Sequence, residues 1–124
     1  MCHVSTAYVN SNMPGKIEEK IYPQPGGKDP EEIVREIVKM SPEEAEQRRS
    51  DILGNYPNTY TFTKSMTERV MLKKVKNCRI AIVRPSIVCG AYKEPMAGWT
   101  ETLSAGQVLV FALAMGLIKF WKTS

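Results

Sequence analysis

Two β-like runs enclose a long region of helical periodicity, and this pattern predicts an α/β protein. Residues 1–9 are rich in β-formers and predict a strand that leads into a turn at residues 10–12. Residues 79–84 form a short apolar run between two arginines, which predicts a buried strand ending at Pro85. Because helices separate the two strands, we expect them to pair in parallel through a crossover connection.

Three helices are predicted between the strands. Asp29 and Pro30 begin the first, whose apolar residues recur at helical spacing: Ile33, Val34, Ile37 and Val38. Ser41 begins a second and mostly charged helix, which Gly54 ends. Residues 58–76 form the third, with an expected core face of Phe62, Met66 and Val70, and with Leu72 and Val75 as further candidates. Residues 11–27 are polar and turn-rich, which indicates a surface excursion.

The tail, residues 104–124, is predicted to be an apolar helix. Residues 108–121 are strongly apolar apart from Lys119. A helix needs about 20 apolar residues to cross a bilayer, and this run is shorter. We therefore expect a buried or membrane-surface helix rather than a transmembrane span.

Composition and charge exclude several classes of function. The chain has 124 residues, of which 43% are hydrophobic and 24% charged, and its net charge of +4 is scattered. No basic arm or Cys/His finger spacing indicates nucleic-acid binding. Three cysteines without metal-ligand spacing predict reduced, mostly buried thiols of an intracellular protein. A single histidine, His3, excludes a multi-histidine metal site within this chain, and we expect no metal and no signal peptide.

Candidate chemistry lies on the third predicted helix. Tyr60 and Lys64 are four residues apart, so they share one face of a helix. An ammonium beside a phenol favours the phenolate and lowers the pKa of the phenol from about 10, which assists proton transfer. Because tyrosine and lysine are both common on amphipathic helices, this spacing alone is a weak signal.

Four blocks in a particular order make the signal specific. They are residues 3–8 (His-Val-Ser-Thr-Ala-Tyr), residues 56–64 (Tyr-Pro-Asn-Thr-Tyr-Thr-Phe-Thr-Lys), residues 84–88 (Arg-Pro-Ser-Ile-Val), and Glu94-Pro95 followed by Gly98-Trp99. In order and chemistry the chain resembles an extended short-chain dehydrogenase/reductase, and within that superfamily the fatty acyl-CoA reductases. The fold implied is a partial Rossmann-like, doubly wound parallel sheet with two core strands and flanking helices.

The resemblance implies a role for each matching residue. Tyr60 would be the general acid, and Lys64 would assist it and bond the nicotinamide ribose. Thr6, or its neighbour Ser5, would polarise the substrate carbonyl. Residues 85–88 (Pro85, Ser86, Ile87 and Val88) would line the nicotinamide. The implied reaction is NADPH-dependent reduction of long-chain fatty acyl-CoA to a fatty alcohol through an aldehyde.

The chain lacks the Gly-rich turn that holds the cofactor pyrophosphate in this family. Residues 1–124 are therefore expected to be the C-terminal half of a reductase domain, whose partners include the acyl-CoA substrate, the N-terminal half or another subunit, and a membrane surface. The family implies the cytoplasmic side of the peroxisomal or endoplasmic reticulum membrane. Two alternatives stay open: an inactive remnant serving as an interaction module, and an extended reductase acting on a sterol or sugar nucleotide.

Overall fold

Two short parallel strands form the sheet of this protein. In the computed structural model, which describes residues 1–102 and 106–118, β1 (Cys2–Val4) pairs in parallel with β2 (Ala81–Val83). The chain divides into two compact units, Met1–Pro85 and Ser86–Ser124, and both strands belong to the first. A parallel pair requires a long crossover, which the helices between the strands provide. The predicted α/β fold with two parallel strands and flanking helices is therefore confirmed.

The first strand is shorter than predicted, because the side chain of Thr6 redirects the backbone. The Ser5 N–H donates to the Val83 carbonyl at 2.7 Å and the Ala7 N–H to the Pro85 carbonyl at 2.9 Å, so the two segments run side by side to this point. The Thr6 hydroxyl then accepts from the Tyr8 N–H at 3.3 Å and caps a 3₁₀ helix, η1 (Ala7–Asn10). Such a local side-chain bond competes with continued strand pairing.

The predicted helix starts at Asp29 and Ser41 are confirmed. After a 3₁₀ turn, η2 (Pro25–Gly27), the Asp29 carboxylate accepts from the Glu31 N–H at 3.0 Å and begins α1 (Pro30–Lys39). The Ser41 hydroxyl accepts from the Glu44 N–H at 3.2 Å. The single charged helix expected next is instead two, α2 (Pro42–Gln47) and α3 (Arg49–Leu53), because the backbone leaves helical geometry at Arg48.

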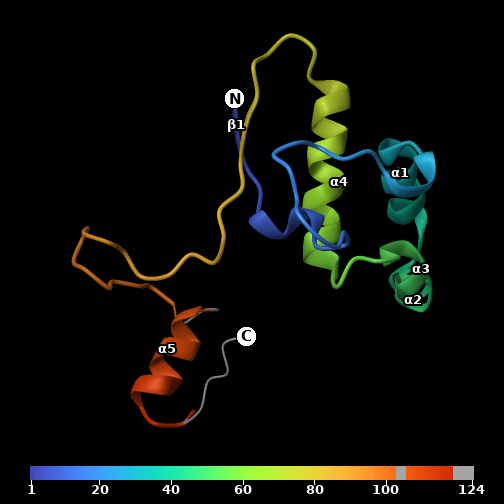
Figure 1. The fold of residues 1–124 in the computed structure, drawn as a ribbon. Coiled ribbons are helices and arrows are strands. Elements are labelled where there is room, and N and C mark those ends of the chain that lie inside the picture. The colour runs from blue at the N-terminus through green and yellow to red at the C-terminus, as the bar shows by residue number, and fades with distance from the viewer. Residues whose placement is uncertain (103–105, 119–124) are drawn as a thin grey trace. The chain divides into compact units, whose positions relative to one another are not determined.

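Helix α4 (Thr59–Lys74) provides most of the buried core of the first unit. The Asn58 side chain begins it by accepting from the Thr61 N–H at 2.9 Å. Phe62, Met66 and Tyr56 are buried, and four partly buried residues of α1 and α3 pack against them: Ile33, Ile37, Ile52 and Leu53. In Figure 1, α4 stands between β1 on one side and α1, α2 and α3 on the other.

Leu72 does not belong to this core, because its side chain is 62% exposed. One face of the sheet is also open. Val4 is 58% exposed and Val83 is 49% exposed, so the strand predicted to be buried is not. Cys2 shares this open face of β1, and Cys78 and Cys89 are exposed as well. The expectation of mostly buried thiols is thus wrong. Parallel strands usually have helices on both faces, and β1 and β2 are covered on one.

The second unit contains a tight loop and an apolar helix. The Ala91 N–H donates to the Trp99 carbonyl at 2.8 Å, and the Gly98 N–H donates to the Ala91 carbonyl at 2.7 Å. A Cβ at Gly90 would lie 2.7 Å from the Gly98 carbonyl oxygen, so this approach requires glycine. Helix α5 (Gly106–Ala114) lies within the predicted apolar tail, of which residues 104–105 and 119–124 are outside the described part. In the described ranges, no helix has the length and hydrophobicity to cross a membrane.

A pair of alanine substitutions on α4 tests the position of the core. Met66 is 3% exposed, so Met66→Ala should lower the free energy of unfolding by about 2–5 kcal/mol. Leu72→Ala, on the same helix but exposed, should change it by less than about 0.5 kcal/mol. Leucine and methionine have similar helix propensities, so the comparison isolates burial. Urea unfolding followed by circular dichroism measures both; equal losses would contradict this placement of the core.

Candidate active site

Tyr60 and Lys64 lie together on one face of α4, as their spacing predicts. The Lys64 ammonium is 6.0 Å from the centroid of the Tyr60 ring. It also donates a hydrogen bond of 3.0 Å to the Val4 carbonyl, at the carboxyl end of β1. Tyr60 is 54% exposed, and its hydroxyl makes no hydrogen bond with any residue that the structure describes. The pair is therefore held at a strand end with its phenol available to a ligand.

Ser5 and Thr6 follow β1 directly, and both are buried, at 3% and 4% exposure. The strand alternation that would send their side chains to opposite faces does not apply, because β1 ends at Val4. The Thr6 hydroxyl caps η1, which leaves its own O–H free to donate. The Ser5 hydroxyl makes no hydrogen bond of regular geometry but faces Glu68 on α4. Which of the two would face a substrate stays a prediction.

The segment predicted to line a nicotinamide is divided between the two units. The Pro85 carbonyl accepts from the Ala7 N–H, so Pro85 lies beside the start of η1 in the first unit. Ser86, Ile87 and Val88 begin the second unit, where all three are exposed. The structure thus brings Pro85 to the same strand ends as Lys64. The role of residues 86–88 stays a prediction.

A buried ion pair that the sequence reasoning missed lies next to these residues. Glu68, 2% exposed, is one turn beyond Lys64 on α4. Its two carboxylate oxygens accept from Arg84 Nε at 2.9 Å and from Arg84 Nη2 at 2.5 Å. Arg84 directly follows β2, so this pair joins α4 to the carboxyl end of the second strand. The available signal was the spacing: Tyr60, Lys64 and Glu68 recur every four residues.

The Arg84 guanidinium decides the charge state of Glu68. Burial disfavours a charged carboxylate, but the hydrogen bonds and positive charge of Arg84 outweigh that effect, with smaller contributions from Ser5 and His3. The pKa of Glu68 is therefore below its ordinary value of 4.5. The same hydrogen bonds raise the pKa of Arg84. At neutral pH both groups are charged.

Tyr56, the first residue of the second motif, has a packing role. Its ring meets Phe62 edge to face, with centroids 5.5 Å apart, and its hydroxyl is 2.8 Å from the Ser65 hydroxyl. The buried Arg69 also donates to the Tyr56 hydroxyl at 3.1 Å and to the Tyr22 carbonyl at 2.9 Å. Together with Asn58, which caps α4, Tyr56 thus helps to set the position of the helix. Much of this motif supports the Tyr60–Lys64 pair rather than contacting a ligand.

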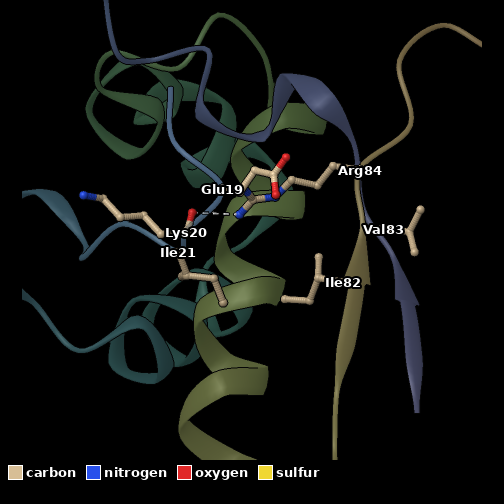
Figure 2. A pocket seen from close by; sticks show the side chains of 6 residues that line it. All are labelled: Glu19, Lys20, Ile21, Ile82, Val83 and Arg84. Carbon is tan, nitrogen blue, oxygen red and sulfur yellow. Dashed lines mark hydrogen bonds between the residues drawn. The ribbon is translucent and has the colours of Figure 1, made fainter. Parts of the chain in front are cut away.

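An open hollow of about 550 Å³ lies beside β2 (Figure 2). Figure 2 shows Ile82 turned toward Ile21 and Val83 pointing to the other side of the strand. Arg84 closes one end, where Nη2 donates to the Lys20 carbonyl at 3.1 Å. Neither Tyr60 nor Lys64 lines this hollow. The hollow therefore lies where Arg84 bonds the loop at residues 19–21, away from Tyr60 and Lys64.

Comparison with known proteins identifies the family. The profile of an NAD-binding family described as "Male sterility protein" matches residues 1–124. The chain belongs to this family. Relatives include fatty acyl-CoA reductase 1 of Xenopus laevis, 37% identical over 122 residues, fatty acyl-CoA reductase 2 of Mus musculus, 35% identical, and fatty acyl-CoA reductase 1 of Gallus gallus, 34% identical. Each alignment covers 98% of this chain and 23% of the relative. No solved structure matches.

These comparisons confirm the resemblance that the four sequence blocks indicate. The Rossmann-like, partial α/β fold agrees with an NAD-binding family. The chain spans about a quarter of the length of the reductases that it matches. The family of this chain and its kind of fold are thus established.

The Glu68–Arg84 pair should make folding sensitive to acid. A carboxyl whose pKa is lowered by folding contributes stability above its unfolded pKa and loses it as the pH falls through the folded value. The free energy of unfolding should therefore decrease as the pH is lowered from about 4.5. Glu68→Gln should reduce this pH-dependent drop, as measured by urea unfolding at a series of pH values.

Asp29 provides the control for this experiment. Its pKa is also lowered, chiefly by the hydrogen bond from Lys73, but this ion pair is exposed and should be screened by salt. Asp29→Asn in high salt should therefore leave most of the drop in place. If Glu68→Gln retained the full drop under the same conditions, the buried pair would not be its source.

Proposed function

We propose that this chain is part of an NADPH-dependent reductase that converts long-chain fatty acyl-CoA to a fatty alcohol through an aldehyde. The observation that carries the proposal is the position of Tyr60 and Lys64, side by side at the carboxyl end of β1. Ligands of open parallel α/β sheets bind beyond the carboxyl ends of the strands. The names of the relatives support the substrate class.

The side chains at the strand ends suit the reduction of a carbonyl. Each of the two reductions consumes one hydride, which adds to the carbonyl carbon, and one proton. In the first the C–S bond then breaks and the proton leaves on the CoA thiol, which gives the aldehyde; in the second the proton stays on the alcohol oxygen. NADPH supplies the hydride when bound. Tyr60 donates the proton at its phenol oxygen, for which its exposed and unpartnered hydroxyl is suited. Lys64 holds a positive charge beside the phenol and stabilises the phenolate that is left.

Further groups that the family resemblance assigns would orient the reactants. The Thr6 hydroxyl, with Ser5 as the alternative, would donate to the substrate carbonyl oxygen. Lys64 and the segment Pro85–Val88 would hold the ribose and carboxamide of the nicotinamide. An exposed phenol and an ammonium at a strand end fit that end of the cofactor. The Gly-rich turn that would hold its pyrophosphate is not among the 124 residues.

The remaining parts of the proposal concern partners and location. The open face formed by Cys2, Val4 and Val83 supports the proposal that another part of the reductase, an N-terminal half or a further subunit, covers the sheet. The exposed apolar side chains of α5 support association with a membrane surface: Val108, Val110, Phe111 and Leu113. We further propose that the reductase lies on the cytoplasmic side of the peroxisomal or endoplasmic reticulum membrane, as the resemblance implies.

Removal of one hydroxyl tests the acid role. In a full-length reductase that carries this segment, Tyr60→Phe should lower alcohol formation by about 10²–10⁴-fold, because no group at that position can then donate the proton. Tyr22→Phe loses a phenol that only accepts a 3.0 Å bond from the Glu18 N–H, and it should stay near wild type. Product formation measured by gas chromatography decides this. Near wild-type turnover of Tyr60→Phe would rule out the acid role.

Cofactor titration tests the expectation that the pyrophosphate site lies elsewhere. The purified 124-residue chain should show no saturable binding of NADPH by fluorescence, since it has no Gly-rich phosphate turn. The full-length reductase is the positive control. A dissociation constant in the micromolar range for the chain alone would contradict the division of the cofactor site that we propose.

A further inference from the structure

Two attachments, one helical turn apart, join the same face of α4 to the two strands. At Lys64 the helix is bonded to the Val4 carbonyl of β1 at 3.0 Å. At Glu68 it is bonded to Arg84, directly after β2, at 2.9 and 2.5 Å. Tyr60 is one further turn along the same face. Tyr60, Lys64 and Glu68 thus form a row along one face of α4, with Tyr60 at one end and the Glu68–Arg84 ion pair at the other.

The two attachments differ in how sharply they define position. A lysine ammonium on a flexible chain bonds a carbonyl from many directions, whereas a guanidinium and a carboxylate meet as two parallel bonds in one plane. Glu68 is 2% exposed, so solvent does not loosen this geometry. Arg84 is itself held by its bond to the Lys20 carbonyl at 3.1 Å. The pair thus defines both the distance and the rotation of α4 against the strand ends.

Tyr60 depends on that placement more than any other residue of the row. Its side chain is 54% exposed and has no hydrogen-bond partner among the described residues. A displacement of α4 by one residue would move its backbone by about 1.5 Å and rotate it by about 100°. The apolar contacts of Phe62 and Met66 pack α4 against α1 and α3 on its other side, so they do not hold the helix against the strand ends.

We propose that Glu68 and Arg84 are positioning residues, which hold α4 in the register that places Lys64 on Val4 and aims Tyr60 at the reacting carbonyl. This inference rests on the proposed function for the roles of Tyr60 and Lys64. The register itself is a property of the chain and can be measured without any activity. Glu68 and Arg84 act through Lys64 and Tyr60 and do not touch the substrate.

The first experiment measures the Lys64–Val4 bond in the 124-residue chain. With valine labelled by ¹³C at the carbonyl, the Val4 resonance reports whether its oxygen accepts a hydrogen bond. Lys64→Met gives the position of this resonance without the bond. In Glu68→Gln, the Val4 resonance should move most of the way to that position. Lys73→Gln removes the exposed pair with Asp29 on the same helix, and it should leave the resonance unchanged.

A second variant makes the result independent of whether Glu68→Gln folds. Arg84→Lys keeps a positive charge beside the buried Glu68, but a single ammonium cannot reproduce the planar fork. It should shift the Val4 resonance in the same direction. The methyl resonance of Met66 shows that each variant retains its core. A Val4 resonance that stays at its wild-type position in folded Arg84→Lys would overturn the proposal.

The second experiment measures the consequence in a full-length reductase that carries this segment. A misplaced acid slows chemistry more than it weakens binding, so Arg84→Lys should lower kcat by roughly 10²-fold with little change in KM for acyl-CoA. A purely structural role would instead lower the fraction of active enzyme and leave kcat per active site unchanged. If wild-type enzyme were inactive, the proposed function would fail, while the Val4 measurement would still decide the register.

Discussion

A carboxylate that is almost completely buried must be paired, and the pairing of Glu68 with Arg84 constrains the rest of the first unit. An unpaired charge in such a place would be expensive, so the fold brings Arg84 from the end of β2 to a residue in the middle of α4. Strand, helix and the loop at Lys20 are thereby joined at one point. The apolar core is small and lies between α4, α1 and α3, so this polar contact helps to fix the position of α4 relative to the strands.

Residues at the start of α4 also help to fix the position of the helix. Asn58 begins the helix through its bond to the Thr61 N–H, and Tyr56 packs against Phe62 one turn later. The helix is thus fixed at its first turn by a cap and near its middle by an ion pair. Tyr60 and Lys64 lie between these two points, on a segment that is held at both sides while the phenol itself is open to a ligand. Rigid support of an exposed group suits the proton donation that we propose for Tyr60.

The open face of the sheet fits the share of a reductase that the chain represents. Two parallel strands with Val4 and Val83 exposed leave apolar surface that a larger α/β sheet would cover. The chain spans about a quarter of the length of the relatives that it matches. The proposed division of the site agrees with this: the residues proposed as proton donor and its lysine are in this chain, and a Gly-rich turn for the pyrophosphate is not.

The sequence by itself determined the family, the order of the elements and the shared face of Tyr60 and Lys64. These follow from local rules: caps at Asp29, Ser41 and Asn58, helical spacing of four residues, and a short apolar run before Pro85. The length of β1 was predicted wrongly, because the Thr6 hydroxyl competes for the backbone at a point that strand propensity does not reveal.

Only the tertiary structure decided which residues are buried and which charges meet. Leu72 and the cysteines have core-like side chains but are exposed. Glu68 and Arg84 are 16 residues apart, and the local sequence around either residue does not predict that they pair. A pattern of spacing places a side chain on a face of a helix. What that face meets depends on the crossover that brings a distant strand beside it.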